Sequence, residues 1–129
     1  MNGENSTRKN IMVCVTRQKT CDRLISRGEE LRGGDESTHL YVVHGVPKGH
    51  NFLGNPYEGE AMEYLFTAAQ LVKAELALLR ADDVETALYE FAQSHDIKVI
   101  VMGAAASPGE SIVTRLQRRL PDVVFDITA

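Results

Sequence analysis

Five short apolar runs, separated by segments with a helical pattern, constrain the fold of this chain more than any other feature of its sequence. Between the runs, apolar residues recur every three or four positions, which is typical of amphipathic helices. This alternation predicts an α/β fold with a five-stranded, mainly parallel sheet and helices on both of its faces. The runs expected to form strands are 11–16 (IMVCVT), 39–46 (HLYVVHGV), 74–80 (AELALLR), 97–103 (IKVIVMG) and 123–127 (VVFDI).

Cap residues and apolar stripes locate the helices. The expected N-caps are Thr20, Asn55, Asp82 and Ser107, and the last three are followed three positions later by Glu58, Glu85 and Glu110, as in capping boxes. Gly33–Gly34 and Pro121 are typical helix ends. The residues expected to face the sheet are Cys21, Leu24, Ile25, Gly28 and Leu31; Ala61, Met62, Leu65, Phe66, Ala69 and Val72; Val84, Leu88, Phe91 and Ala92; and Ile112, Val113, Leu116 and Leu120.

Composition limits the classes of protein to which the chain belongs. Its 129 residues suit one domain, expected at 11–129 after a flexible tail at 1–10. The net charge of -4 disfavours nucleic acid as a partner, and no apolar run approaches the ~20 residues of a membrane span. Two cysteines do not make a disulfide framework, which favours a reducing cytoplasm. The four histidines have no metal-ligand spacing, so no metal site is expected.

Some residues carry both a structural and a functional interpretation. Cys21 lies near a helix start, where the dipole lowers the pKa of a thiol, so a redox role is one hypothesis. His44 is interpreted as a structural histidine. The loop 47–57, with Phe52 and Leu53, is either a lid or partner patch or a segment folded onto the core.

The stretch 99–116 (VIVMGAAASPGESIVTRL) joins a strand to a helix through small residues, a layout that often cradles a phosphate. In parallel α/β sheets, ligands bind at the carboxyl ends of strands. The first strand ends at Thr16–Arg17 and the fourth at Met102–Gly103, so we expect any ligand crevice there. Three arginines, Arg115, Arg118 and Arg119, follow on the last helix and are interpreted as a solvated face, with a phosphate or partner contact as the alternative.

The chain resembles a universal stress protein domain. Within that family it is most similar to the domain found in osmosensitive potassium-channel (Kdp) sensor kinases. The matching stretches are IMVCVTRQKTCDRLISRG, LYVVHGVP, GEAMEYLF, VETALYEFAQSHDIKVIVMG and SIVTRLQRRLPDVV. The resemblance implies the adenine nucleotide alpha hydrolase-like (Rossmann-like) fold, with strand order 3-2-1-4-5 and the fifth strand at an edge.

ATP-binding members of that family have an aspartate after the first strand and a glycine-rich phosphate loop. Thr16 stands where that aspartate would be, Gly103 matches the first glycine, and Ala106 replaces the second. Glu110 replaces the third glycine, Ser111 matches the serine, and the loop is several residues shorter. The resemblance makes a degenerate nucleotide site the candidate, with Val15, Thr16, Arg17, Val43, Met102, Gly103, Ala106, Gly109 and Ser111 as its residues.

The same loop has a structural interpretation. Phosphate loops use glycines so that main-chain N–H groups approach the phosphate oxygens, and Ala106 adds a Cβ there. In the capping box, Glu110 would return to Ser107 and place a negative charge where a phosphate would lie. The loop is therefore a closed, capped turn, a retained ATP site, or a site for a different ligand.

Three classes of function follow from these observations. The leading one is a cytoplasmic regulatory or sensor module that binds ATP weakly or not at all and acts through a homodimer or a partner such as a sensor kinase. The second is a nucleotide-binding module for ATP, AMP or a cyclic dinucleotide. The third is a weak nucleotide hydrolase, although the sequence shows no catalytic constellation and no resident cofactor is expected.

The fifth strand is the expected dimer interface; the alternative is a monomer whose edge is covered by the N-terminal tail or by a neighbouring kinase in a larger assembly. An edge strand exposes unpaired main-chain groups, and residues 123–127 contain no Pro, Gly or Lys to block pairing. The expected interface residues are Val123, Val124, Phe125, Asp126 and Ile127, with the first, third and fifth on one face and the other two on the opposite face.

Overall fold

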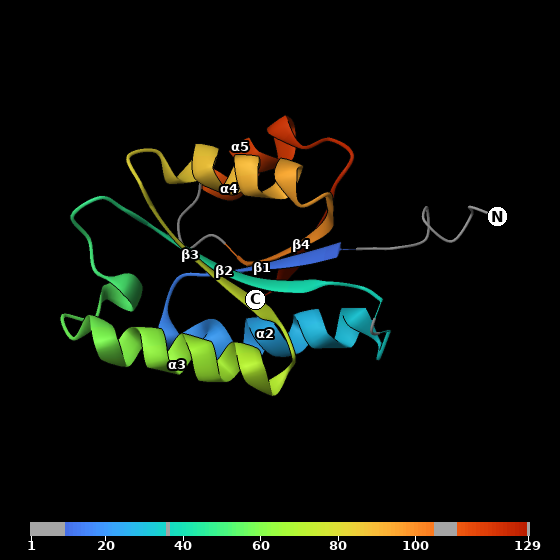
Figure 1. Cartoon of the computed structure of the whole chain (residues 1–129). Coiled ribbons are helices and arrows are strands. Elements are labelled where there is room, and N and C mark those ends of the chain that lie inside the picture. Colours follow the sequence, from blue (N-terminus) through green and yellow to red (C-terminus); the bar gives the residue numbers. More distant parts are fainter. Residues whose placement is uncertain (1–9, 36, 105–110, 129) are drawn as a thin grey trace.

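A parallel sheet lies between two layers of helices in the computed structural model, which describes residues 10–35, 37–104 and 111–128. Figure 1 shows α2 and α3 on one face of the sheet and α4 and α5 on the other. The elements in chain order are β1 (Asn10–Val15), α2 (Gln18–Arg32), β2 (Leu40–Pro47), the short 3₁₀ helix η1 (Phe52–Gly54), α3 (Glu58–Leu71), β3 (Glu75–Ala81), α4 (Val84–Ser94), β4 (Ile97–Gly103), α5 (Ile112–Arg119) and β5 (Val124–Thr128).

The sheet has the order β3-β2-β1-β4-β5, and each neighbouring pair is parallel. The α/β class and the order 3-2-1-4-5 are therefore confirmed. Val13 in the central strand pairs with Val42 of β2 and Val101 of β4. Each strand begins within one residue of its expected position; Asn10, expected in the tail, belongs to β1.

The sheet separates two apolar cores. Alternate residues of β1 point to opposite faces, as expected for a strand. Val13 and Val15 pack against α2 and α3, whereas Met12 and Cys14 pack against α4 and α5. Because both faces of the central strands are covered, these strands are continuous apolar runs in the sequence.

Three of the predicted N-caps are wrong. α2 begins at Gln18 with Arg17 at the N-cap position, so Thr20 lies inside its first turn. α3 begins at Glu58 rather than after Asn55, whose side chain instead accepts the N–H of Tyr57 at 2.8 Å.

The N-cap of α4 is Asp83, one residue after the expected Asp82, and its side chain accepts the N–H of Thr86. Glu85 is not part of a capping box; its carboxylate instead accepts hydrogen bonds from Arg115 and Arg119 of α5. The end of α2 is as predicted, with Gly33 at the C-cap in the left-handed conformation.

The predicted stripe of α3 is only partly buried. Ala61, Leu65 and Ala69 are buried, but Met62 is 44% exposed and Phe66 is 54% exposed. α3 covers the edge strand β3, and in the described part of the chain the sheet does not extend beyond that strand to bury the outer flank of the helix. Leu31, near the end of α2, is also exposed rather than buried.

Candidate functional site

The carboxyl ends of β1 and β4 lie side by side, as the sequence predicted, because the two strands are parallel neighbours. The strand order reverses direction between them, which is the topological position where α/β sheets bind ligands. Thr16 and Arg17 follow β1 and are exposed, and Gly103 at the end of β4 is half-buried. The topology thus brings these three candidate residues together at the carboxyl end of the sheet.

The apolar candidates are enclosed in the core. Val15 packs on the α2 and α3 side of the sheet, whereas Val43 and Met102 pack on the α4 and α5 side. All three side chains are buried, so a ligand at the carboxyl end of the sheet would contact their main-chain groups. The carbonyl of Val15 already accepts a hydrogen bond from His44.

Among the described residues, packing does not require a glycine at position 103. A Cβ built there would lie 3.9 Å from Cδ1 of Leu24, which is ordinary van der Waals contact. The next residue, Ala104, donates its N–H to the carbonyl of Thr128 at 3.0 Å, which ties the end of β4 to β5. The described neighbours of Gly103 are therefore compatible with a larger side chain or with the approach of a ligand.

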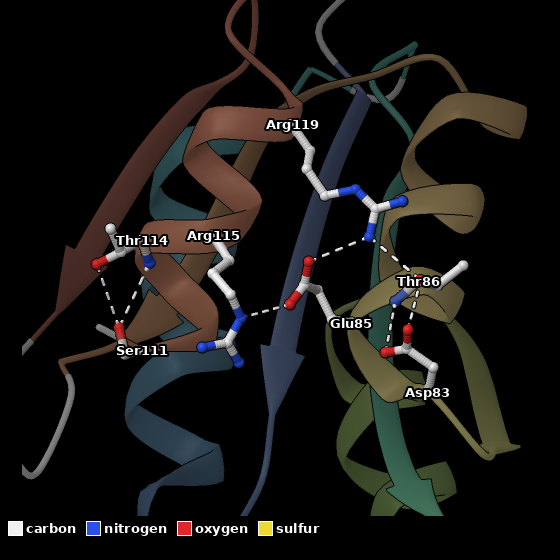
Figure 2. A network of polar contacts seen from close by, with 7 residues as sticks. All are labelled: Asp83, Glu85, Thr86, Ser111, Thr114, Arg115 and Arg119. Atoms are coloured by element: carbon white, nitrogen blue, oxygen red, sulfur yellow. Dashed lines mark hydrogen bonds and ion pairs between the residues drawn. The ribbon is translucent and has the colours of Figure 1, made fainter. Parts of the chain in front are cut away.

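The beginning of α5 differs from the expected capping box. Ser111 occupies the N-cap, and its hydroxyl accepts the N–H of Thr114 at 3.4 Å (Figure 2). The predicted cap Ser107 and its partner Glu110 lie outside the described residues, as do Ala106 and Gly109 of the candidate site. The candidate phosphate ligand Ser111 therefore has a structural role at the start of α5.

Two of the three arginines on α5 do not form a solvated face. Figure 2 shows Arg115 and Arg119 reaching from α5 to Glu85 of α4. Nε of Arg115 donates to Glu85 at 2.6 Å, and Nη1 of Arg119 donates to the other carboxylate oxygen at 3.1 Å. The hydrogen bond from Arg115 is the largest cause that lowers the pKa of Glu85, with Arg119 adding to it.

This cross-helix network fixes α5 against α4. Arg119 also donates to the hydroxyl of Thr86 at 3.2 Å and stacks over the ring of Tyr89 at 4.2 Å. Glu85 was not predicted as the partner of these arginines, because its spacing from Asp82 matched a capping box. The sequence also contains Asp83 with Thr86 three residues later. If Asp83 is taken as the N-cap, Glu85 is left to bind another residue.

His44 is a structural histidine, as interpreted from the sequence, and the loop after β2 folds onto the core. Nδ1 of His44 lies 2.8 Å from the carbonyl oxygen of Val15, and the N–H of Leu53 donates to Nε2 at 2.8 Å. Phe52 is buried, with the Arg80 guanidinium 4.2 Å from its ring centroid. Of the two interpretations of this loop, the structure shows the segment packed on the core.

Cys21 has no feature of a reactive thiol. Burial, with the nearby Asp22 carboxylate as a smaller cause, raises the pKa of Cys21 to about 12. Its Sγ donates to the carbonyl of Arg17 at 3.1 Å. The expected lowering by the helix dipole is therefore wrong, because the side chain points into the core rather than along the helix axis toward solvent.

The edge strand β5 carries exposed apolar residues on both faces. Val124 is 63% exposed, and Ile127 is 41% exposed. Asp126 lies on the α2 side, where Arg27 binds it through Nε and Nη2, the latter at 2.9 Å. Phe125 packs on the α4 and α5 side, so the predicted alternation of side chains along this strand is confirmed.

A shallow depression of about 510 Å³ lies beside β5 along α2. Its lining includes Arg23, Ser26 and Thr128. Within the described ranges there is no group of three or more His, Cys, Asp or Glu residues that could hold a metal ion. The same ranges contain no helix long and apolar enough to cross a membrane.

Solved structures with the same fold are universal stress proteins. One from Archaeoglobus fulgidus is 20% identical, with a TM-score of 0.71 over 98% of this chain and 97% of that chain. A complex of the Archaeoglobus fulgidus universal stress protein with dAMP is 21% identical, with a TM-score of 0.66 over 94% of this chain and 98% of that chain. A universal stress protein family member from Burkholderia pseudomallei is 19% identical, with a TM-score of 0.61 over 94% of this chain and 96% of that chain.

No protein-family model and no curated protein sequence matches this chain. The structural similarities show that the chain has the universal stress protein fold.

Proposed function

We propose that this chain is a cytoplasmic regulatory module of the universal stress protein family that acts by pairing with a protein through β5. The fold shared with universal stress proteins over 98% of the chain supports the family. The observation that carries the proposed mode of action is the position of β5 at the end of the strand order, with Val124 and Ile127 exposed on its two faces.

An added strand would satisfy this edge. Unpaired main-chain N–H and C=O groups at a sheet edge attract another strand, and proteins normally cover or block such edges. Antiparallel pairing of two copies about a two-fold axis satisfies both edges at once. The side chains of Val124 and Ile127 would then lie beside side chains of the added strand, each on its own face of the sheet. The depression beside Arg23 and Thr128 offers room for the partner's side chains.

The sequence resemblance suggests the biological setting. The sequence resembles the universal stress protein domain of Kdp sensor kinases, so we propose a sensor kinase as the heterologous partner. We propose no catalytic role: among the described residues, the candidate crevice combines a threonine, an arginine and main-chain groups.

Lysine substitutions test the pairing. Val124→Lys places a charge on the edge and should weaken self-association at least tenfold in analytical ultracentrifugation, since edge lysines block strand pairing. The matched control is Leu71→Lys, which changes an even more exposed apolar residue on α3, far from β5 in the sheet order. If the two variants associate alike, the interface does not lie at β5.

A second candidate function is weak binding of an adenine nucleotide at the ends of β1 and β4. The specific observation in its favour is the dAMP complex of the Archaeoglobus fulgidus universal stress protein, which has the same fold. Thr16 replaces the aspartate that the family resemblance places against the adenosine, and Ser111 serves as a helix cap. We therefore expect a dissociation constant for ATP no tighter than about millimolar.

Restoring the carboxylate tests this second candidate. Thr16→Asp should tighten ATP binding about tenfold in calorimetry, the effect of one added hydrogen bond of about 1.4 kcal/mol. Thr67→Asp, on the exposed side of α3, makes the same change of charge away from the crevice and should not. Micromolar binding by the unmodified chain would contradict the proposal of weak binding, and no gain with Thr16→Asp would argue against this site.

A further inference from the structure

The His44 side chain joins the end of β1 to the loop 48–57 through both of its ring nitrogens. It is 1% exposed, with Nδ1 2.8 Å from the Val15 carbonyl oxygen and Nε2 2.8 Å from the Leu53 nitrogen. A main-chain N–H only donates, so Nε2 must be the acceptor and Nδ1 must carry the proton. The observed contacts therefore require a neutral imidazole with its proton on Nδ1.

The loop does not hold this conformation by its own preference. Leu53 has φ 56° and ψ 16°, the left-handed region that a leucine rarely adopts. Its strained backbone places its N–H on Nε2 of His44. Next to it, the buried Phe52 ring lies 5.6 Å from the His44 ring, centroid to centroid. The hydrogen bond and this ring contact hold the turn together with two main-chain hydrogen bonds inside it, from Gly54 to Asn51 and from Asn55 to Phe52.

Charged groups surround the loop from its neighbouring elements. Glu58 of α3 accepts the N–H of Phe52 at 3.2 Å and also pairs with Arg80 of β3, whose guanidinium covers Phe52. At the start of the loop, Lys48 pairs with Asp82 at 3.6 Å. These charges are paired with one another, whereas the two partners of the His44 ring nitrogens are neutral main-chain groups.

We propose that His44 is an acid-sensitive latch whose protonation releases the loop 48–57 from the carboxyl end of β1. A proton on Nε2 would face the N–H of Leu53, so two donors would meet and the hydrogen bond would be lost. The left-handed turn at Leu53 then relaxes and the loop opens. The latch goes beyond the proposed function, because it needs neither a nucleotide nor a protein partner.

The direction of the pH response follows from burial. Burial lowers the pKa of His44, and the hydrogen bond to Val15 only partly opposes this. In the open loop the ring regains an ordinary pKa of about 6.5. The open state therefore binds more protons, so opening begins as the pH falls below about 6.5 and levels off below the lower pKa of the closed state.

Nuclear magnetic resonance on the full chain tests the latch. The ring nitrogens of His44 should report the neutral form with its proton on Nδ1 at pH 7.5. Hydrogen exchange at Leu53, corrected for the intrinsic effect of pH, should lose about tenfold in protection between pH 7.5 and 5.0. The upper limit is about 30-fold, set by an ordinary histidine pKa in the open state. The amide of Val42, in the buried part of β2, serves as the reference for global unfolding.

Two variants separate the latch from other effects of pH. His44→Gln keeps a donor and an acceptor but does not titrate, so protection at Leu53 should no longer depend on pH. His50→Gln removes an exposed histidine of the same loop and should behave like the unmodified chain. A proton on Nε2 at pH 7.5, or unchanged protection at Leu53 relative to Val42, would overturn the proposal. An unaltered pH response in His44→Gln would overturn it as well.

Discussion

Replacing Gly28 by alanine tests how closely α2 packs on the central strand. A Cβ at this position would lie 2.5 Å from Cγ2 of Val13 and 3.2 Å from Cδ1 of Leu40. Val13 is fully buried, and its branched side chain has little rotamer freedom, so the helix or the strand must shift. Overpacking of this kind costs about 1–3 kcal/mol, and alanine returns about 1 kcal/mol of helix propensity. We expect a net loss of about 0–2 kcal/mol.

Gly59→Ala is the matched control. Gly59 also lies in a helix, α3, but a Cβ there meets nothing within 4 Å. This variant should gain up to about 1 kcal/mol from helix propensity alone. Because that gain is largely common to both variants, the difference between them, about 1–3 kcal/mol, measures the crowding at Gly28.

Urea unfolding of the two variants provides the measurement. Their midpoints should separate, with Gly28→Ala unfolding at the lower concentration, while the slopes stay equal because the surface exposed on unfolding is the same. If Gly28→Ala is as stable as Gly59→Ala, α2 does not approach β1 as closely as the 2.5 Å distance requires.

Three further predictions concern individual side chains. Ser111→Ala should cost about 1 kcal/mol in urea unfolding, since it removes the side chain that caps α5 at Thr114. Arg27 lowers the pKa of Asp126, so the pair of side chains stabilises the folded chain. This stabilisation is complete above the unfolded pKa of 3.8 and is lost as the pH falls through the lower pKa of the folded state. Arg27→Gln should therefore weaken the acid dependence of stability. The Cys21 thiol, whose pKa burial raises to about 12, should resist iodoacetamide at pH 8 until urea unfolds the chain; rapid labelling of the folded chain would show that it is accessible.

The three central strands, β1, β2 and β4, could be predicted to within one residue because a strand covered on both faces is a continuous apolar run. The helix starts could not. Near α4 the sequence offers two adjacent candidates, Asp82 and Asp83, and both have a plausible partner three residues later. The structure uses Asp83 with Thr86, because Glu85 is engaged by the arginines of α5. A local pattern cannot reveal a partner that lies thirty residues away.

The α3 stripe shows a second limit of pattern reading. Helical spacing identified the apolar flank that includes Met62 and Phe66, but spacing does not say how wide the supporting sheet is. β3 is the edge strand under α3, so the outer part of the stripe remains exposed.

The position proposed for the candidate site could be derived from the sequence, whereas the contacts around it could not. Topology alone placed it at the ends of β1 and β4, because ligands bind where the winding of a parallel sheet reverses. The contact of His44 with Leu53 was not predictable, because it depends on a left-handed turn at a leucine, which no residue preference signals.

Sedimentation equilibrium of the unmodified chain, with and without millimolar ATP, tests the central claim most directly. The account predicts twice the 14.3 kDa monomer mass at tens of micromolar protein, unchanged by ATP, because pairing uses the outer edge of β5, on the side that faces away from β4 and β1. A monomer under both conditions, or a dimer that forms only when ATP is added, would contradict it.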